Sequence, residues 1–379
     1  MGIAKEFVQL AAPHIEETDI EAVVSVLRSP RLANGPKVLE FEQRIAEYTG
    51  AKYAVAVSSG TAALHIIVRA LGLQRGDEVL VPSFTFAATV NALLYEGVMP
   101  VFVDIEPDTF NLDPEQLKNS ITKRTKAIMA VDIFGHPAEW DEILNFADNY
   151  GLKVIDDACE ALGAEFKGKR VGSFGDAAAF AFYPNKQITT GEGGMIVTNN
   201  KEIAQLARSL RNQGRGEKLE WLLHERLGFN YRMDEMSAAL GVSQLDKIEG
   251  RLRTRRKLAD LYTKLLEEIP WVEPPKTRDY TRSAWFAYTI LLSDEINRDA
   301  VMREMRSLGV ETRAYFPPVH QQPYIKKIFG NEVNIHLPYT EYTSRRTLSL
   351  PLHSRLKTEE VHLVVDVLRE AVFRVSAKG

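Results

Sequence analysis

Short apolar runs alternate with stretches of helical periodicity from Tyr53 to about Asn200. The runs are continuous in Val, Ile and Ala, which is typical of strands buried on both faces. Strands are predicted at 53–57, 78–81, 100–103, 127–133, 153–155, 177–182 and 195–197, with helices at 61–72, 86–96, 114–120 and 139–150. Ahead of them, Thr18 and Glu21 match a capping box that opens a further helix. This alternation predicts the α/β class, with a mostly parallel sheet covered by helices on both faces.

The pattern changes in the last third of the chain. A long, charge-dense helix is predicted from about Asp234 to Ile269, and Pro274-Pro275 follows it. After the prolines come a predicted strand at 286–292 and predicted helices at 297–307 and 361–372. A chain of 379 residues is too long for one core. We therefore expect a large domain with an N-terminal arm, residues 1–245, and a smaller C-terminal α/β domain, residues 246–379, joined by the long helix.

Composition narrows the class of protein. A net charge of −4, with 45% hydrophobic and 26% charged residues, is ordinary for a globular protein and gives no electrostatic case for nucleic acid or an anionic membrane as partner. No apolar run reaches the roughly 18 residues that span a bilayer. Cys159 is the single cysteine, so an internal disulfide is excluded. The N-terminal residues have neither a signal-peptide core nor a transit-peptide composition. A cytoplasmic protein is expected.

Small and aromatic residues follow the first two predicted strands. In Ser58-Ser-Gly-Thr-Ala-Ala-Leu64, small residues at a strand-to-helix junction leave backbone N–H groups open, and a helix N-terminus favours an anion. The segment is either a phosphate cradle or a tight turn. It matches neither a Walker A motif nor GxGxxG, which argues against ATP and dinucleotides. Pro82-Ser-Phe-Thr-Phe86 places aromatic side chains at the same sheet edge, either as core or as a ligand platform.

Two carboxylates end a later strand, in Val154-Ile-Asp-Asp157. They lie at the edge where open α/β sheets bind ligands. They could bind a metal, act as acid and base, pair with a cationic ring nitrogen, or cap the next helix. The eight histidines form no HExxH or similar pair, and no second acidic cluster is present, so no metal site is predicted.

Lys186 lies in a turn-rich, glycine-rich segment between two apolar runs. An ammonium beside packed strands is costly unless it is paired, exposed or chemically used, and desolvation makes a lysine nucleophilic toward carbonyl compounds. Taken alone it could be a surface lysine. Together with the cradle, the aromatic and the acid, it completes a set that can hold pyridoxal phosphate: a phosphate anchor, a ring cover, a partner for the pyridinium nitrogen and a Schiff-base amine.

The same segments resemble the DegT/DnrJ/EryC1/StrS family of sugar aminotransferases, a branch of the fold-type I pyridoxal phosphate enzymes. The resemblance runs from about residue 35 to residue 351. Its markers are Asn34-Gly-Pro36 with Phe41-Glu42, Ser59 to Leu64, Pro82 to Phe86, Phe134-Gly-His-Pro137, Asp157-Ala158, Gly172 to Asp176, Lys186 with Gly191-Glu-Gly-Gly194, Gly228 to Met233 and Leu348 to Pro351. It implies a fold-type I architecture with a sheet of the seven-stranded type. It also implies an aminotransferase that moves an amino group, from glutamate, onto a nucleotide-linked keto-sugar.

Roles for individual residues follow from this resemblance. Lys186 would form the Schiff base with pyridoxal 5'-phosphate and shuttle the proton, and Asp157 would pair with the pyridine nitrogen. Phe86 would stack on the ring. The phosphate would be bound by Ser59, Gly60, Thr61 and Ala62. Asn230 of the neighbouring subunit would reach the same phosphate, which makes a homodimer part of the site. The candidate substrate contacts are Tyr183, Arg232, Tyr315 and His320.

Two positions depart from the family pattern. Ala181 stands where the family usually has Ser, so one hydroxyl contact to the phosphate is missing. Glu160 stands where the family commonly has Gln or His against the ring. A carboxylate there contacts the O3′ side of the cofactor only if it is protonated or bridged by water. Relatives that dehydrate sugars carry His at the lysine position, so Lys186 favours transamination.

Other functions stay open at the level of sequence. One is an aminotransferase or lyase of a cyclitol or aromatic-amine pathway with the same cofactor. Another is a non-catalytic regulator or structural dimer that binds the cofactor. Intact Lys186 and Asp157, and the lack of a DNA-binding appendage, argue against the second. The expected partners are a nucleotide sugar, an amino-acid donor and a second copy of the chain, with no nucleic acid and no membrane.

Overall fold

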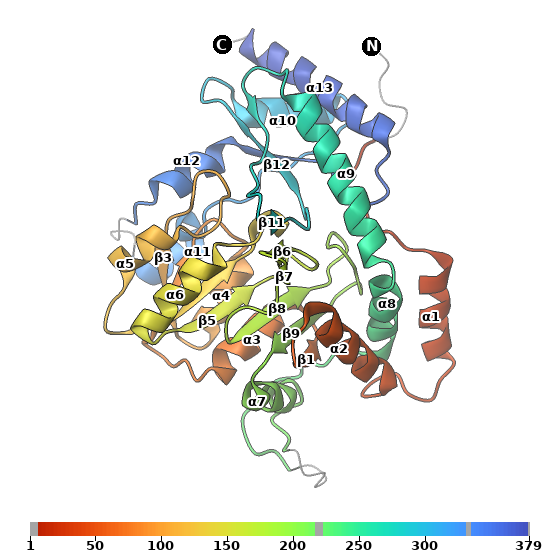
Figure 1. The fold of residues 1–379 in the computed structure, drawn as a ribbon, viewed down its shortest axis with the longest axis vertical. Helices are drawn as coiled ribbons and strands as arrows, with labels where there is room; N and C mark the ends of the chain where they lie inside the picture. Colours follow the sequence, from red (N-terminus) through yellow and green to blue (C-terminus); the bar gives the residue numbers. More distant parts are fainter. Residues whose placement is uncertain (1–6, 217–222, 331–334, 378–379) are drawn as a thin grey trace.

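The computed structural model describes residues 7–216, 223–330 and 335–377. Figure 1 shows a broad sheet across the lower half of the view and a smaller sheet above it, with the long helix α9 passing between the two regions. A cavity lies at one edge of the broad sheet, and the order and direction of the strands determine which strand ends meet there.

The elements follow one another as strand–helix units through the first half of the chain. The helices are α1 Glu17–Leu27, α2 Pro36–Thr49, α3 Gly60–Ala70, α4 Ala87–Tyr95, α5 Leu117–Ser120, α6 Trp140–Tyr150, α7 Lys201–Arg211, α8 Glu235–Leu245, α9 Ile248–Leu266, α10 Arg298–Ser307, α11 Pro323–Phe329, α12 Pro338–Arg346 and α13 Thr358–Ser376, with short 3-10 turns η1 Pro114–Gln116, η2 Ile133–Gly135 and η3 Val319–Gln321. The strands are β1 Tyr53–Val57, β2 Glu78–Pro82, β3 Met99–Val103, β4 Thr125–Val131, β5 Lys153–Asp157, β6 Glu165–Phe166, β7 Lys169–Arg170, β8 Ala177–Ala181, β9 Gly194–Thr198, β10 Val272–Glu273, β11 Thr281–Arg282, β12 Tyr288–Leu292 and β13 Thr347–Leu350.

The broad sheet has the strand order β1-β9-β8-β5-β4-β2-β3. The pairs from β3 through β2, β4 and β5 to β8 are parallel, whereas β9 is antiparallel to both β8 and β1. The predicted mostly parallel, seven-stranded sheet is therefore confirmed. Since β1 runs in the same direction as β8, the carboxyl ends of β1, β2, β4, β5 and β8 all lie at one edge, where open sheets bind their ligands.

Alternate side chains of each strand enter two different cores. Val55 and Val57 of β1 pack with residues of α3, α4 and α7, whereas Ala54 and Ala56 pack with residues of α2, α6 and α8. Helices therefore cover both faces of the sheet (Figure 1). Burial on both faces explains why these strands read as continuous apolar runs instead of alternating ones.

The small antiparallel sheet β10-β12-β13 has its own core against α9, α10 and α13. The predicted strand and helices of this region are present, although β12 begins at Tyr288, two residues later than predicted. A third small sheet, β11-β6-β7, joins residues 281–282 to the large region. The boundary between residues 245 and 246 stays a prediction.

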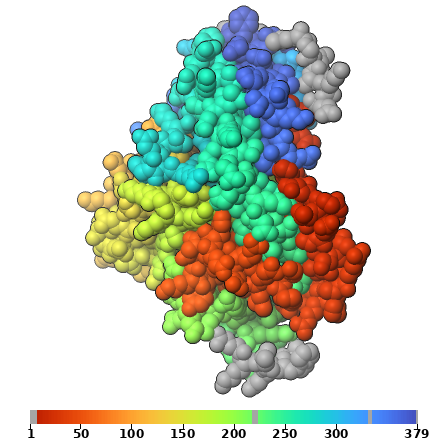
Figure 2. Space-filling model, turned by 45° about the vertical axis from the view of Figure 1, so that its right-hand side comes forward, coloured from red at the N-terminus to blue at the C-terminus, as the bar shows by residue number. Residues whose placement is uncertain are grey.

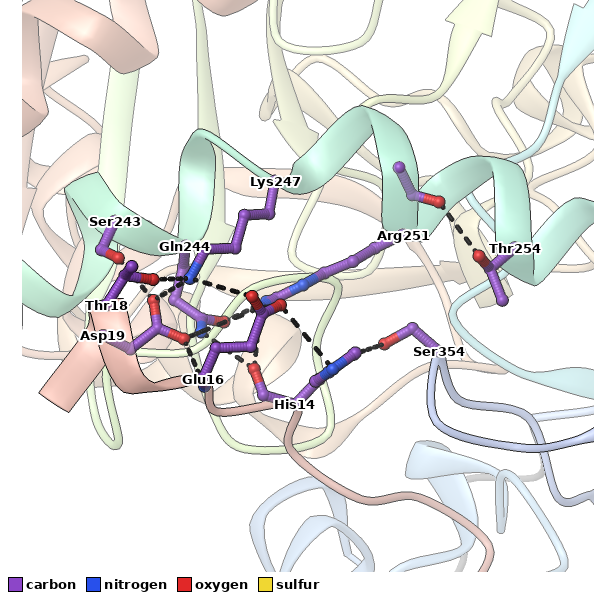
Figure 3. Close-up of polar contacts among 11 residues, drawn as sticks. His14, Glu16, Thr18, Asp19, Ser243, Gln244, Lys247, Arg251, Thr254 and Ser354 are labelled. Atoms are coloured by element: carbon purple, nitrogen blue, oxygen red, sulfur yellow. Dashed lines mark hydrogen bonds and ion pairs between the residues drawn. The ribbon is translucent and has the colours of Figure 1, made fainter.

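Polar contacts bind the N-terminal segment to the junction of α8 and α9 (Figure 3). The buried Asp19 carboxylate accepts a hydrogen bond from Lys247 Nζ at 2.8 Å. Arg251 Nη2 donates to the His14 carbonyl at 2.7 Å, and the His14 ring contacts Ser354 Oγ at 3.1 Å. The space-filling view shows the red N-terminal residues lying along the turquoise α8–α9 segment (Figure 2). One charged cluster thus ties three distant parts of the chain together.

Two predicted helix boundaries are wrong in the same region. The capping residue of α1 is Glu16, whose N–H donates to Asp19 at 2.9 Å, because the Thr18 hydroxyl instead accepts a hydrogen bond from Lys247. The single helix expected from about Asp234 to Ile269 is two helices, α8 and α9, separated at Asp246–Lys247. The interruption places Lys247 against Asp19.

No helix of the described ranges is long and apolar enough to cross a membrane.

Candidate active site

A cavity of about 380 Å³ opens at the carboxyl edge of the broad sheet. Its walls include residues at the ends of β1, β2, β4, β5 and β8. The predicted site residues that line it are Ser59, Gly60, Thr61, Phe86, Asp157, Glu160, Tyr183, Lys186 and Tyr315. The described residues contain no group of three or more His, Cys, Asp and Glu side chains placed to hold a metal ion. The cavity gathers the amine of Lys186 and the carboxylates of Asp157 and Glu160.

The N-terminus of α3 forms one wall of the cavity. Ser59 is its N-cap, and the Ser59 hydroxyl accepts a hydrogen bond from the Ala62 N–H at 3.1 Å. The N–H groups of Gly60 and Thr61, in the same first turn, have no carbonyl acceptor within the helix. A Cβ on Gly60 would lie 2.7 Å from the Ala181 Cβ, so only glycine lets this turn approach the end of β8 so closely. The wall is suited to a phosphate group.

Asp157, at the end of β5, is held by two hydrogen bonds. Thr89 Oγ1 donates to Asp157 Oδ2 at 2.7 Å, and the Cys159 N–H donates to Asp157 Oδ1 at 3.2 Å. The Thr89 hydroxyl also contacts Thr85 Oγ1 at 2.9 Å. The residue is buried at the cavity wall, so these donors fix where its carboxylate faces. A fixed carboxylate in a cavity suits pairing with a cationic ring nitrogen.

Lys186 brings an amine into the same cavity. Its Nζ lies 3.6 Å from Glu160 Oε1 and 4.0 Å from the centre of the Phe286 ring. The other oxygen of Glu160 accepts the Phe134 N–H at 2.9 Å. Burial raises the pKa of Glu160, and the charge of Lys186 opposes that shift. The ammonium is thus held between a carboxylate and an aromatic face, an arrangement that favours a cation.

Residues from the C-terminal part of the chain complete the cavity wall. The N–H groups of Ala284 and Phe286 donate to the carbonyls of Gly135 and Phe134, at 2.8 and 2.9 Å. Gly135 has a φ of +86°, and a Cβ there would lie 2.9 Å from the Phe286 nitrogen. Glycine at 135 therefore allows the two segments to meet. Phe316, which also lines the cavity, stacks on Phe134 with ring centres 5.6 Å apart.

Four predicted residues lie outside the cavity lining. Ala62 is buried within the first turn of α3. Asn230 is exposed on the surface, and Arg232 lines a separate pocket. His320 is buried, with its Nδ1 2.7 Å from Ser83 Oγ. None of the last three touches the cavity within this subunit.

Sequence reasoning missed several residues of the cavity, among them Thr89, Phe286 and Phe316. Thr89 had a usable signal, since it lies in the first turn of the helix that follows the Pro82–Phe86 segment. Phe286 and Phe316 had none, because only tertiary structure brings their segments to the sheet edge.

The chemistry of this donor set fits a phosphorylated pyridine aldehyde such as pyridoxal phosphate. The helix N-terminus would hold the phosphate, Asp157 would pair with the ring nitrogen and Lys186 would react with the aldehyde. Cys159 also lines the cavity, but burial raises the pKa of its thiol well above the ordinary value. The thiol therefore stays protonated and is a poor nucleophile, which leaves Lys186 as the group for carbonyl chemistry.

Comparisons with known proteins agree with this geometry. The sequence model described as the DegT/DnrJ/EryC1/StrS aminotransferase family matches residues 13–369. GDP-perosamine synthase of Caulobacter vibrioides is 37% identical over 369 residues, covering 96% of this chain and 98% of that protein.

Solved structures are similar over almost the whole chain as well. PseC of Helicobacter pylori, described as an aminotransferase involved in the biosynthesis of pseudoaminic acid, has a TM-score of 0.92 at 29% identity, covering 98% of this chain and 100% of that chain. The PLP form of Spr1654 from Streptococcus pneumoniae has a TM-score of 0.90 at 26% identity, covering 97% and 99%. The aminotransferase-like fold of the chain is thereby confirmed.

Proposed function

Since the chain belongs to the DegT/DnrJ/EryC1/StrS aminotransferase family, we propose that it transfers an amino group from an amino acid to a keto-sugar linked to a nucleotide. Glutamate is the expected donor, and pyridoxal phosphate is the cofactor. The enzyme class, a pyridoxal phosphate-dependent sugar aminotransferase, follows from the family and from its named relatives.

The meeting of Lys186 and Asp157 in one cavity beside the N-terminus of α3 carries this proposal. A regulator that only binds its ligand has no need of a desolvated amine. Each of the three groups would have one role: the Ser59–Thr61 turn would hold the phosphate, Asp157 would pair with the ring nitrogen, and Lys186 would react with the aldehyde carbon. Phe86, exposed at 63% yet lining the cavity, would cover one face of the ring.

Bound pyridoxal phosphate supplies an electron sink that stabilises negative charge on the substrate carbon. The chain supplies the proton transfer: Lys186 Nζ accepts the proton that leaves this carbon and then gives it up again. Asp157, fixed by Thr89, would keep positive charge at the ring nitrogen. The apolar walls formed by Phe286 and Phe316 exclude water from the reacting atoms.

The substrate class rests on the relatives and on the shape of the cavity. GDP-perosamine synthase carries a sugar nucleotide in its name, and PseC is described as involved in the biosynthesis of pseudoaminic acid. Tyr183 is 52% exposed while lining the same cavity, so the cavity opens to the surface beside it. An open mouth suits a sugar whose nucleotide extends outside the cavity.

A homodimer with shared sites belongs to the same proposal. Asn230 is exposed and lies outside its own cavity, which leaves it available to the phosphate bound by a second subunit. Arg232 and His320 keep the weaker assignment of substrate contacts. The two-domain division at residues 245 and 246 and the cytoplasmic location also stand as proposals.

A spectrophotometric half-reaction tests the function. Glutamate added to the protein loaded with pyridoxal phosphate should shift the absorbance band to that of the aminated cofactor. One member of a panel of GDP-, UDP- and TDP-linked keto-sugars should then restore the original absorbance band. Lys186→Ala should abolish both changes, whereas the exposed Lys169→Ala should behave as wild type. Protein that binds no pyridoxal phosphate would contradict the function, and a response to keto-cyclitols alone would favour the alternative pathway.

A further inference from the structure

Glu160 is a carboxylate held rigidly inside the protein. The residue is 6% exposed, and its side chain is fixed by the Phe134 N–H at 2.9 Å. Its backbone carbonyl accepts Gln187 Nε2 at 2.5 Å, so it is also tied to the residue that follows Lys186. A buried carboxylate is costly without a cation beside it. The cation that the structure provides is Lys186.

The ammonium of Lys186 is in turn surrounded by few charges. Among the described residues, its ion pair is with Glu160, at 3.6 Å. The other titratable groups that line the cavity are Asp157, Cys159, Tyr183, Glu192 and Tyr315. Burial raises the pKa of Cys159 and of Tyr315, so both stay neutral. The Asp157 carboxylate is already engaged by Thr89 and by a backbone N–H.

We propose that Glu160 is the counter-ion that stabilises Lys186 while Nζ carries the transferred proton. The inference rests on the proposed function, in which Lys186 takes up and releases that proton. During the reaction the neutral Nζ accepts a proton from the substrate carbon and becomes an ammonium, and Glu160 stays ionised throughout. Nζ would then give that proton to the C4′ carbon of the cofactor, which returns the amine to its neutral form.

The charge of Glu160, not its shape, carries this role. Glutamine has the same length and keeps an oxygen that can accept the Phe134 N–H, but it has no negative charge. An opposite charge within 4–6 Å favours the charged form of a group by about one to three pH units. Glu160→Gln should therefore leave the cavity in place and remove the charge that stabilises the Lys186 ammonium.

The first test uses the cofactor-free protein, so it does not depend on turnover. Trace acetylation with acetic anhydride over a range of pH, with the Lys186 peptide quantified by mass spectrometry, reports the fraction of neutral amine. In Glu160→Gln the Lys186 peptide should be acetylated faster than in wild type at the same pH. Glu160→Asp, which keeps the charge, should remain closer to wild type. Glu165→Gln, on β6 and paired with Arg282 at 3.4 Å, is the matched control and should match wild type.

The second test uses the loaded enzyme and glutamate deuterated at its reacting carbon. Glu160→Gln should lower kcat with little change in KM, and it should raise the deuterium isotope effect on kcat, since proton transfer to Nζ becomes slower. An unchanged acetylation profile for Glu160→Gln would overturn the inference even if transamination is intact. Conversely, absence of pyridoxal phosphate binding by the wild type would overturn the function, whereas the acetylation result would still stand.

Discussion

Thr89 Oγ1 donates a 2.7 Å hydrogen bond to Asp157 Oδ2, so the first turn of α4 fixes the acid at the end of β5. Thr89→Val has nearly the same volume but lacks the hydroxyl. Losing a hydrogen bond to a charged group costs about 1.5–3 kcal/mol. We expect kcat to fall about tenfold or more, because the Asp157 carboxylate is less well fixed against the ring nitrogen.

Thr89→Ser is the matched control for this prediction. It keeps the hydroxyl and should retain most of the activity, with kcat and KM measured for the same donor and acceptor. If Thr89→Val turned over as fast as wild type, Thr89 would have no role in holding Asp157.

The broad sheet could be predicted because its strands are apolar on both faces and because helices follow most of them, although β5 and β8 lead into further strands. The long predicted helix failed at Asp246–Lys247 because tertiary contacts decide that position, where Lys247 bonds to Asp19. Helical periodicity continues through such a break, since the polar residues there would suit a solvated helix face equally well. The two-residue strands β6, β7, β10 and β11 have too few residues to show any periodicity.

The candidate site could be predicted where a residue with a reactive or ligand-binding side chain lies at or just after the end of a strand. Ser59, Phe86, Asp157 and Lys186 do so, and the structure gathers them around one cavity. Phe286 could not be placed there, because its position depends on hydrogen bonds to the distant Phe134 segment.

A pair of buried acids predicts an unusual pH dependence of stability. Asp132 and Asp156 are both fully buried. Burial raises the pKa of Asp132 to about 7, and burial together with the Asp132 charge raises the pKa of Asp156. The folded protein thus keeps protons that the unfolded chain has released above about pH 4. The free energy of unfolding should therefore fall by about 2–4 kcal/mol from this pair as the pH rises from 4 to 8.

Asp156→Asn should remove much of this fall, because an amide can donate to Asp132 without titrating. Urea unfolding at a series of pH values and fixed protein concentration measures it. Asp148→Asn, an exposed position on α6, is the matched control and should follow wild type. Equal slopes for Asp156→Asn and wild type would show that the pair does not hold a proton at neutral pH.

Ala181, at the end of β8, allows a gain of affinity to be predicted. Ala181 lines the cavity beside the first turn of α3, and a Cβ added to Gly60 would lie 2.7 Å from the Cβ of Ala181. Ala181→Ser adds a hydroxyl next to the expected phosphate position. One neutral hydrogen bond is worth about 0.5–1.5 kcal/mol, so the Kd for pyridoxal phosphate should fall about two- to tenfold. Pyridoxal without phosphate is the control ligand; an equal gain for both would place the new contact elsewhere.

The exposed position of Asn230 predicts that two defective subunits can restore one working site. Asn230→Asp should repel the phosphate of the neighbouring site, and Lys186→Ala removes the amine from its own. In a mixed dimer purified through two different tags, one cavity has both Lys186 and an intact partner Asn230. That dimer should therefore recover about half of the wild-type activity.

Lys186→Ala mixed with Asp157→Asn is the matched control: both residues line the same cavity of one subunit, so neither cavity is complete and no activity should return. Failure of the Asn230→Asp mixture to recover activity, in a dimer that still binds pyridoxal phosphate, would mean that Asn230 does not serve the partner's site.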